Sequence, residues 1–197
     1  MQRKYIAAAA FTVVATVAGV AAVTTRPDHE TEAVSFDVAH LRVRIDISDR
    51  RLYVEENGEQ IASYGVAVGT GSHPTPRGAF STRRIIWNPR WVPPDAAWAK
   101  KERVREPGDP KNPMGRVKIF FREPDYYIHG TNAESSIGTA ASHGCVRMRN
   151  EEVIELARMM VAKGGGAEPG LIRRLINNIR QTREVRLNSP VAVRVQT

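Results

Sequence analysis

The chain contains a single cysteine, Cys145, among chemically useful neighbours. His143 and Gly144 come directly before it, and His129 precedes it by sixteen positions. A thiol is a strong nucleophile only as the thiolate, and an imidazole can remove its proton while a nearby cation or helix N-terminus stabilises the resulting charge. These residues therefore predict nucleophilic catalysis by a cysteine with a histidine as base.

Two histidines compete for the role of base. His143 is two residues from Cys145, so in an extended segment both side chains leave the same face, but this adjacency leaves little room for a hydrogen bond and a substrate together. His129 returns to the sulfur through a loop of fifteen residues and suits the role better. Gly144 lets the backbone bend beside the sulfur, so that backbone N–H groups face a developing oxyanion.

The same residues allow less reactive interpretations. A lone cysteine is most often a small buried apolar side chain, and both histidines could be structural. A zinc site built from Cys145, His129 and His143 would need a fourth ligand, and none stands at a recognisable spacing. We therefore expect neither a metal nor a cofactor.

Five segments occur in an order that carries a resemblance. The two that hold the chemistry are Ile128-His129-Gly130-Thr131 and Ser142-His143-Gly144-Cys145-Val146-Arg147-Met148. Three lie upstream, at residues 66–70 with 75–80, at 89–94 and at 112–115. Together they resemble the L,D-transpeptidase catalytic domain, the YkuD family of bacterial cell-wall enzymes, from about residue 40 to about residue 162.

The resemblance implies a reaction and two catalytic roles. Members of the family attack the carbonyl of the third residue of a peptidoglycan stem tetrapeptide, expel the terminal D-alanine and hold the stem as a thioester. The amine of a neighbouring stem then resolves the thioester into a 3→3 cross-link. By motif position, Cys145 would be the nucleophile and His129 the general base that later protonates the leaving amine.

The resemblance also implies roles for the groups around this pair. Backbone N–H groups of His143, Gly144 and Cys145 would bind the oxyanion, and the carbonyl of Gly130 would orient the ring of His129. Gly130 departs from relatives that carry Ser at this place, but a carbonyl role survives the change.

Three residues are predicted to bind substrate: Arg147, Ser142 and Trp91. Arg147 would pair with a carboxylate of the donor stem by a bidentate contact, and the alternative is a local ion pair with Glu151. Trp91 would form a wall of the cleft, and the alternative is a buried structural aromatic. It lies in an irregular stretch, residues 88–115, with six prolines. We interpret that stretch as a lid beside the substrate, with a surface insertion as the alternative.

The first 25 residues form a targeting segment. Arg3 and Lys4 precede a charge-free run rich in Ala and Val over residues 6–23, which predicts a signal peptide or an uncleaved membrane anchor. Residues 26–39 would be a linker, and residues 40–197 one catalytic domain. We expect an exported protein of the periplasm or cell envelope, whose N-terminus engages the inner membrane or the export machinery. An unpaired thiol in an oxidising compartment favours the functional interpretation of Cys145.

Residues 40–197 are predicted to be mainly β, an antiparallel β-sandwich or meander of the L,D-transpeptidase type with one or two helices packed on it. Alternation of apolar and polar residues predicts the strands, and a helical period predicts the helices. Asn57-Gly58 predicts a hairpin turn. The expected strands are 41–47, 52–54, 61–68, 80–87, 117–121, 125–128, and a closing hairpin-like pair at 185–187 and 191–195; the expected helices are 151–161 and 171–179.

The formal net charge of +8 suits a protein held near anionic envelope polymers. Nucleic acid is not expected as a partner, because the arginines are scattered and no nucleic-acid motif is present. The expected partner is a peptidoglycan stem peptide, with a lysine of an envelope protein as another acceptor. Two alternatives stay open: a hydrolytic L,D-carboxypeptidase or amidase of the same family, and a non-catalytic peptidoglycan-binding module.

Overall fold

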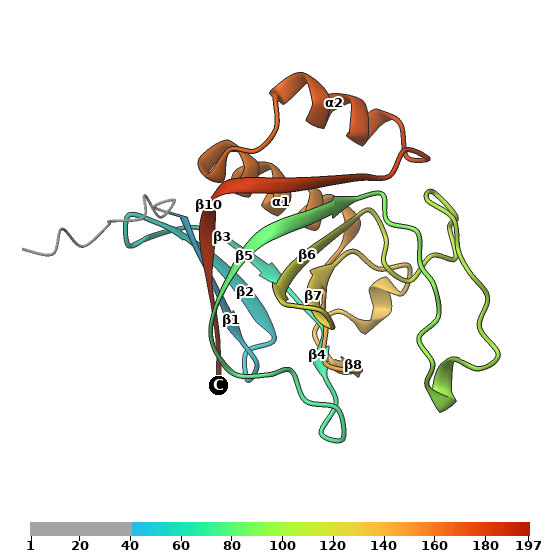
Figure 1. Cartoon of the computed structure of the whole chain (residues 1–197). Helices are drawn as coiled ribbons and strands as arrows, with labels where there is room; N and C mark the ends of the chain where they lie inside the picture. Colours follow the sequence, from blue (N-terminus) through green and yellow to red (C-terminus); the bar gives the residue numbers. More distant parts are fainter. Residues whose placement is uncertain (1–40) are drawn as a thin grey trace, which may run out of the picture. The chain divides into compact units, whose positions relative to one another are not determined.

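The computed structural model describes residues 41–197, so the expected leader (residues 1–25) and linker (26–39) lie outside the described part. Eight strands form one curled sheet in the order β3-β2-β1-β10-β5-β6-β7-β9, and β4 pairs with β8 (Figure 1). The strands are β1 (Leu41–Asp46), β2 (Arg51–Glu56), β3 (Glu59–Gly65), β4 (Val68–Gly69), β5 (Gly78–Trp87), β6 (Val117–Arg122), β7 (Tyr126–His129), β8 (Ala140–Ser142), β9 (Val146–Arg147) and β10 (Arg183–Gln196). The mainly β prediction is confirmed.

The first three strands form the expected antiparallel meander. Leu41, Val43 and Ile45 of β1 are fully buried, so alternate side chains of this strand face the core. Asn57 and Gly58 join β2 to β3 with φ values of 53° and 87°, the two positive values that a two-residue hairpin turn of type I′ requires.

The sheet is mixed rather than purely antiparallel. Strand β1 runs parallel to β10, and β7 runs parallel to β9. Parallel neighbours need a crossover between them, and for β7 and β9 this crossover is the loop between His129 and Val146. The parallel pairing of β7 with β9 therefore exists because the chain leaves the sheet after His129 and returns to it directly after Cys145.

The closing hairpin that we expected is wrong, because β10 is one strand of 14 residues that pairs with β5 along most of its length. Its register shifts between Arg186 and Val191, where the Arg83 guanidinium donates hydrogen bonds to the carbonyls of Leu187 and Asn188. The segment with Pro190 is thus an irregularity inside a strand, where a proline is tolerated.

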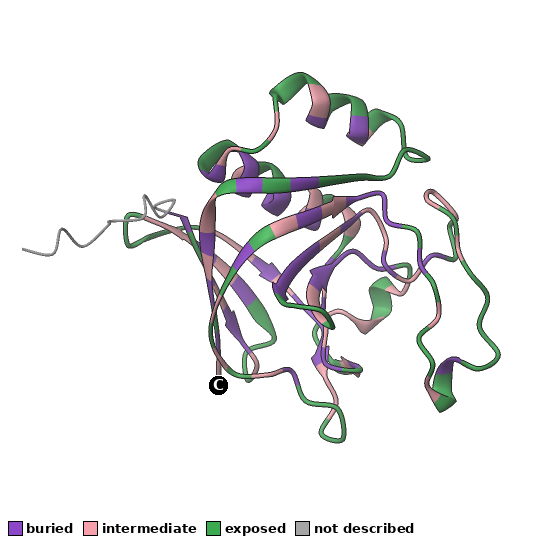
Figure 2. Ribbon diagram, viewed as in Figure 1, coloured by how far each residue is buried: buried purple, intermediate pink, exposed green. Residues whose placement is uncertain are grey.

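Two helices complete the fold. Helix α1 (Asn150–Gly164) packs on β10, β6 and β7 with one apolar face buried, and Figure 2 shows its opposite face exposed. Helix α2 (Pro169–Asn177) begins with a proline and buries Ile172 and Leu175. Both helices were predicted, with ends displaced by one to three residues.

The stretch from residue 88 to 115 is irregular, as expected, apart from a short 3₁₀ helix, η1 (Ala97–Ala99). In Figure 1 it extends as a long green loop at the right of the sheet. Among residues 41–197, no helix is both long and apolar enough to cross a membrane.

Candidate active site

Strands β7 and β9 bring the two ends of the signature together. Ile128 pairs with Val146, and His129 pairs with Arg147, in parallel register. Ile128 and Val146 are fully buried in the core. Because side chains alternate along a strand, His129 and Arg147 project from the opposite face, and Cys145, two residues before Arg147, lies on that side as well. The loop thus returns the cysteine to the strand that carries His129.

His129 is almost fully buried, with 3% of its surface exposed. Its Nδ1 lies 2.6 Å from the carbonyl oxygen of Gly130. A carbonyl only accepts, so Nδ1 carries the proton and Nε2 keeps its lone pair. Burial lowers the pKa of His129 to about 3, helped by the charges of Arg147 and Lys118. The ring is therefore neutral at physiological pH and oriented as a base.

Gly130 leaves no room for a larger residue. A Cβ at this position would lie 2.3 Å from Oδ1 of Asn150 and 2.9 Å from the amide nitrogen of Arg116. Asn150 occupies this place because its Oδ1 accepts from the Arg116 amide at 2.9 Å and its Nδ2 donates to the Thr131 carbonyl at 3.0 Å. The departure from Ser thus has a steric cause here, and the Gly130 carbonyl oxygen accepts from the histidine ring.

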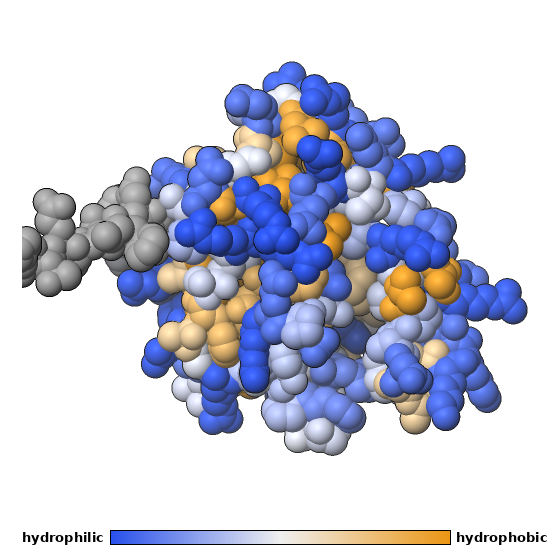
Figure 3. All heavy atoms as spheres, in the orientation of Figure 1, coloured by the Kyte–Doolittle hydropathy of each residue, from blue (hydrophilic) through white to orange (hydrophobic). Residues whose placement is uncertain are grey.

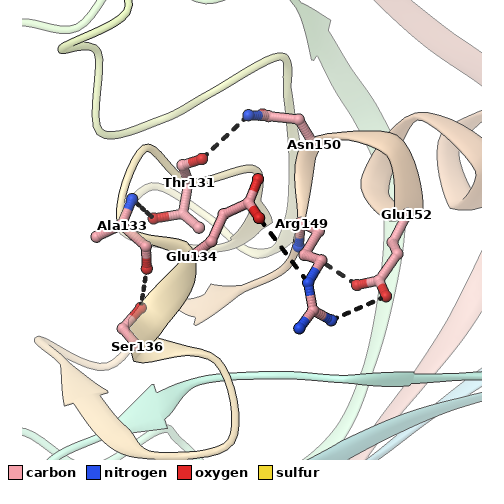
Figure 4. A network of polar contacts seen from close by, with 7 residues as sticks. All are labelled: Thr131, Ala133, Glu134, Ser136, Arg149, Asn150 and Glu152. Atoms are coloured by element: carbon pink, nitrogen blue, oxygen red, sulfur yellow. Dashed lines mark hydrogen bonds and ion pairs between the residues drawn. The ribbon is translucent and has the colours of Figure 1, made fainter.

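A polar network fixes the loop after His129 to the start of α1 (Figure 4). The Ala133 amide donates to Thr131 Oγ1 at 3.0 Å, and Ser136 Oγ donates to the Ala133 carbonyl at 2.6 Å. Arg149 lies between Glu134 and Glu152, at 4.0 Å and 3.3 Å. Exposed ion pairs are individually weak, so the part-buried hydrogen bonds of Asn150 contribute more to holding this loop.

Cys145 is half-buried, and its Sγ donates to the Asp125 carbonyl at 3.4 Å. Burial raises the pKa of the Cys145 thiol, since a low-dielectric environment disfavours the thiolate. Hydrogen bonds from the amide and hydroxyl of Tyr127, and the charges of Lys118 and Arg147, act in the opposite direction. The sulfur is thus a half-buried thiol whose protonated form is favoured by burial, while Tyr127, Lys118 and Arg147 favour the thiolate.

The turn before Cys145 is braced by Ser142. Its hydroxyl accepts from the Gly144 amide at 3.0 Å and donates to the Cys145 carbonyl at 2.5 Å. Gly144 has a φ of 106°, and a Cβ there would lie 2.8 Å from the ring of Tyr126. Ser142 is buried, so its hydroxyl serves the turn and the structure gives no exposed group for the predicted substrate contact.

Of the three predicted oxyanion donors, one is already engaged, since the Gly144 amide donates to Ser142. The amides of His143 and Cys145 have no acceptor within residues 41–197. These two N–H groups flank the engaged one and are the available donors for a negatively charged oxygen.

His143 is exposed and stacks against Trp98 of η1, with ring centroids 4.4 Å apart and an interplanar angle of 15°. The ring of His73 also contacts His143, with ring centroids 4.8 Å apart. Trp91, predicted as a cleft wall, is instead 7% exposed, and its backbone bridges to Arg105. The irregular stretch therefore reaches the signature through Trp98, which no sequence signal separated from Trp91.

Arg147 is half-buried on the side of Cys145, and burial lowers the pKa of its guanidinium while the nearby sulfur opposes this. In the part of the chain that the structure describes, Arg147 has no carboxylate within ion-pair distance, Glu151 included. The local pair that we weighed against a substrate role is thus not formed. The contact with a substrate carboxylate stays a prediction.

Comparison with known proteins decides the family. A model described as the L,D-transpeptidase catalytic domain, YkuD, matches residues 40–185. This chain belongs to the YkuD family of L,D-transpeptidases. The putative L,D-transpeptidase YkuD of Bacillus licheniformis is 34% identical over 124 residues, which are 63% of this chain and 62% of that protein. The probable L,D-transpeptidase YbiS of Escherichia coli is 32% identical over 125 residues, 59% of this chain and 40% of that protein.

This family member spans about three fifths or less of the length of those relatives. Among solved structures, L,D-transpeptidase 3 from Mycobacterium tuberculosis, in complex with a faropenem-derived adduct, has a TM-score of 0.50 at 14% identity. The match covers 80% of this chain and 60% of that one. At this identity the likeness shows the fold alone.

Two residues near Cys145 in the candidate site were missed by sequence reasoning, Lys118 and Tyr127. Lys118 lies opposite His129 in the antiparallel register of β6 and β7. Tyr127 lies two residues before His129 on the same face. The signal that could have found them is alternation: once His129 is placed on the face away from the core, every second residue of both strands shares its side.

The fold has a hollow away from Cys145 and His129. A groove of about 850 Å³ is lined by residues of α1, α2 and the segment between them, most of them apolar, together with Glu155, Arg158 and Arg173. Figure 3 shows apolar side chains exposed between charged ones over these helices. None of the proposed catalytic residues lines this groove, and within residues 41–197 no cluster of three or more His, Cys, Asp or Glu is arranged to hold a metal ion.

Proposed function

We propose that this protein is a cysteine acyltransferase that acts on peptidoglycan stem tetrapeptides. The observation that carries the proposal is the orientation of His129. Its Nδ1 proton is held by the Gly130 carbonyl, and its strand, β7, pairs with β9, which begins directly after Cys145. The parallel pairing of β7 with β9 brings the segments of His129 and Cys145 together. Nucleophilic catalysis by cysteine needs a neutral, oriented imidazole of this kind near the thiol.

In the first step, the Cys145 sulfur attacks the carbonyl carbon of the third stem residue. The thiol proton passes to Nε2 of His129, and the amides of His143 and Cys145 stabilise the oxyanion. His129 then gives this proton to the nitrogen of the leaving D-alanine as the C–N bond breaks. The product is a thioester and free D-alanine.

In the second step, an amine of a second stem attacks the thioester. His129 accepts the proton of the amine and returns it to the sulfur as the C–S bond breaks, which leaves a 3→3 cross-link and a regenerated thiol. Water in place of the amine would give hydrolysis, and a lysine of an envelope protein would give attachment. Arg147 lies beside the sulfur with its charge free of local carboxylates, which suits the carboxylate of a donor stem.

We also propose that the protein works outside the cytoplasm, in the periplasm or cell envelope. The charge-free run over residues 6–23 supports export or anchoring, and the substrate class is found there.

Purified muropeptides incubated with the full chain in detergent test the proposal. Mass spectrometry is expected to show loss of D-alanine together with 3→3 dimers, and Cys145→Ser is expected to abolish both. Loss of D-alanine without dimers would assign hydrolysis. Unchanged muropeptides with the parent chain, or an active Cys145→Ser variant, would refute the cysteine mechanism.

A β-lactam provides a second readout, because L,D-transpeptidase 3 from Mycobacterium tuberculosis carries a faropenem-derived adduct. Incubation of this chain with faropenem is expected to add mass to the intact protein, at the peptide that contains Cys145. The Cys145→Ser variant should gain no mass.

A further inference from the structure

Lys118 is a half-buried cation whose charge lowers the pKa of the Cys145 thiol. Its Nζ lies 3.7 Å from the centroid of the Tyr127 ring and 4.7 Å from that of Phe120. Phe120 pairs with Tyr127, and Lys118 pairs with His129, so all four side chains share one face of β6 and β7. Residues 41–197 place no carboxylate within ion-pair distance of this ammonium. A cation removed from water requires compensation, and aromatic faces supply only part of it.

Tyr127 connects this cation to the thiol. Its amide and its hydroxyl lower the pKa of the Cys145 thiol, as donors to the anionic form do. In the resting site the thiol itself donates to the Asp125 carbonyl at 3.4 Å. Burial raises the pKa of the Tyr127 phenol, and the nearby sulfur raises it further. The hydroxyl therefore stays protonated over the working pH range and can only donate to a thiolate.

His129 cannot store the proton of the thiol. Burial lowers its pKa to about 3, and the positive charges of Arg147 and Lys118 lower it too. A stable pair of thiolate and imidazolium would put a third cation into a buried site that already holds two. The proton can rest on His129 only while the substrate is being attacked.

The charged and titratable groups around the sulfur come from each neighbouring strand or turn. They are Lys118 from β6, Tyr127 and His129 from β7, Arg147 from β9, Asp125 from the turn before β7, and Arg84 from β5, whose charge acts on Lys118. The Asp125 carbonyl accepts from the thiol and cannot stabilise a thiolate. The negative charge of the Asp125 carboxylate raises the pKa of both Lys118 and Tyr127, so both keep their protons.

We propose that Lys118 and Tyr127 form the thiolate-stabilising pair of this site, the ammonium through its charge and the phenol through its hydrogen bond. The inference rests on the proposed cysteine chemistry and adds to it the groups that hold the negative charge. Both residues keep their own protons throughout. The proton of the thiol passes to His129 and then to the leaving amine. Within the mechanism they are positioning residues, because neither touches the scissile bond.

The test is the pH dependence of alkylation of Cys145 by iodoacetamide, followed by intact mass on the full chain. Lys118→Met is expected to move the midpoint of the profile upward by about one pH unit, a roughly tenfold slower reaction below the midpoint. Lys118→Arg should restore most of the rate because it keeps the charge. Tyr127→Phe keeps the ring and removes one donor, so a rise of about half a unit is expected, roughly a threefold slower reaction.

Arg122→Met is the matched control. Arg122 lies on the same strand as Lys118 and over another tyrosine, Tyr126, at 5.4 Å, but it is exposed and has no part in the site. Its profile should coincide with that of the parent. If the Lys118→Met and Tyr127→Phe profiles also coincide with the parent, the proposal is overturned. Should Lys118→Met fail to fold, Tyr127→Phe decides by itself, and an unchanged midpoint refutes the pair.

This experiment needs no peptidoglycan, so its outcome is separate from that of the proposed function. A shifted profile in a chain that leaves muropeptides unchanged would support the thiolate pair and refute the acyl transfer. A chain that cross-links muropeptides, with alkylation profiles that the Lys118 and Tyr127 substitutions do not shift, would support the acyl transfer and refute the thiolate-stabilising pair.

Discussion

At the scale of single residues, one carbonyl decides which nitrogen of His129 is basic. The Gly130 oxygen holds the proton on Nδ1, so Nε2 is free to accept one. His129→Ala should therefore reduce turnover of stem peptides by about 10² to 10⁴, the usual contribution of a general base. Rates measured with D-alanine release as readout would check this, and activity within a few-fold of the parent would contradict the role.

The same glycine gives a stability prediction. A Cβ at Gly130 would lie 2.3 Å from Asn150 Oδ1, and the Arg116 amide stands at 2.9 Å, so the neighbours must move. Gly130→Ser is expected to lower the free energy of unfolding by about 1–3 kcal/mol, measured by urea denaturation. Gly71→Ser is the matched control, because nothing lies within 4 Å of a Cβ there. Equal free energies of unfolding for the two variants would show that the loop rearranges at no cost, and would contradict the steric prediction.

At the scale of elements, the irregular stretch touches the signature through Trp98. This side chain is 49% exposed and stacks on His143, two residues before the nucleophile. Trp98→Ala should leave the free energy of unfolding within about 0.5 kcal/mol of the parent, since exposed side chains contribute little. KM for the stem peptide should rise several-fold while kcat changes less, because the irregular stretch would lose the stacking contact that fixes it next to His143. Val92→Ala, 57% exposed on the same stretch, should change neither constant.

The elements also show what the sequence could and could not predict. Alternation located the strands, and the helical period located α1 and α2, because both patterns record a local choice of buried face. The final strand was misread at Asn188-Ser-Pro190, although buried Leu187 and Val191 are four residues apart and keep one face through the irregularity. Pro190 was given more weight than that continuity.

At the scale of the molecule, motif spacing predicted that the segments of Cys145 and His129 come together, because sequence order alone suggested a strand, a loop and a return, and β7 does pair with β9. It did not find Lys118, which is 27 positions before Cys145 and reaches it only through the pairing of β6 with β7. It also could not separate Trp98 from Trp91, since that choice depends on the path of an irregular segment. Contacts that arise from sheet order lie beyond what local patterns record.

The buried base has a consequence for the stability of the fold. The pKa of His129 is about 3 in the folded chain, against an ordinary value of 6.5 for histidine, so the unfolded chain binds more protons between these values. Stability is thus complete above about pH 6.5 and falls as the pH decreases toward 3, by up to roughly 1.4 kcal/mol per pH unit. Urea denaturation at pH 7 and pH 5 measures this loss.

His129→Gln, which keeps a polar side chain of similar size without a titrating ring, should lose less stability over the same interval. The pKa of Asp46 is lowered chiefly by a hydrogen bond from the Asp49 backbone. The stability that this group supplies is therefore lost only when the pH falls to the ordinary titration range of a carboxylate and below. Pairing pH 7 with pH 5 therefore isolates the histidine from this acid. If His129→Gln and the parent lose the same free energy of unfolding, the buried ring is not the group that limits stability in mild acid.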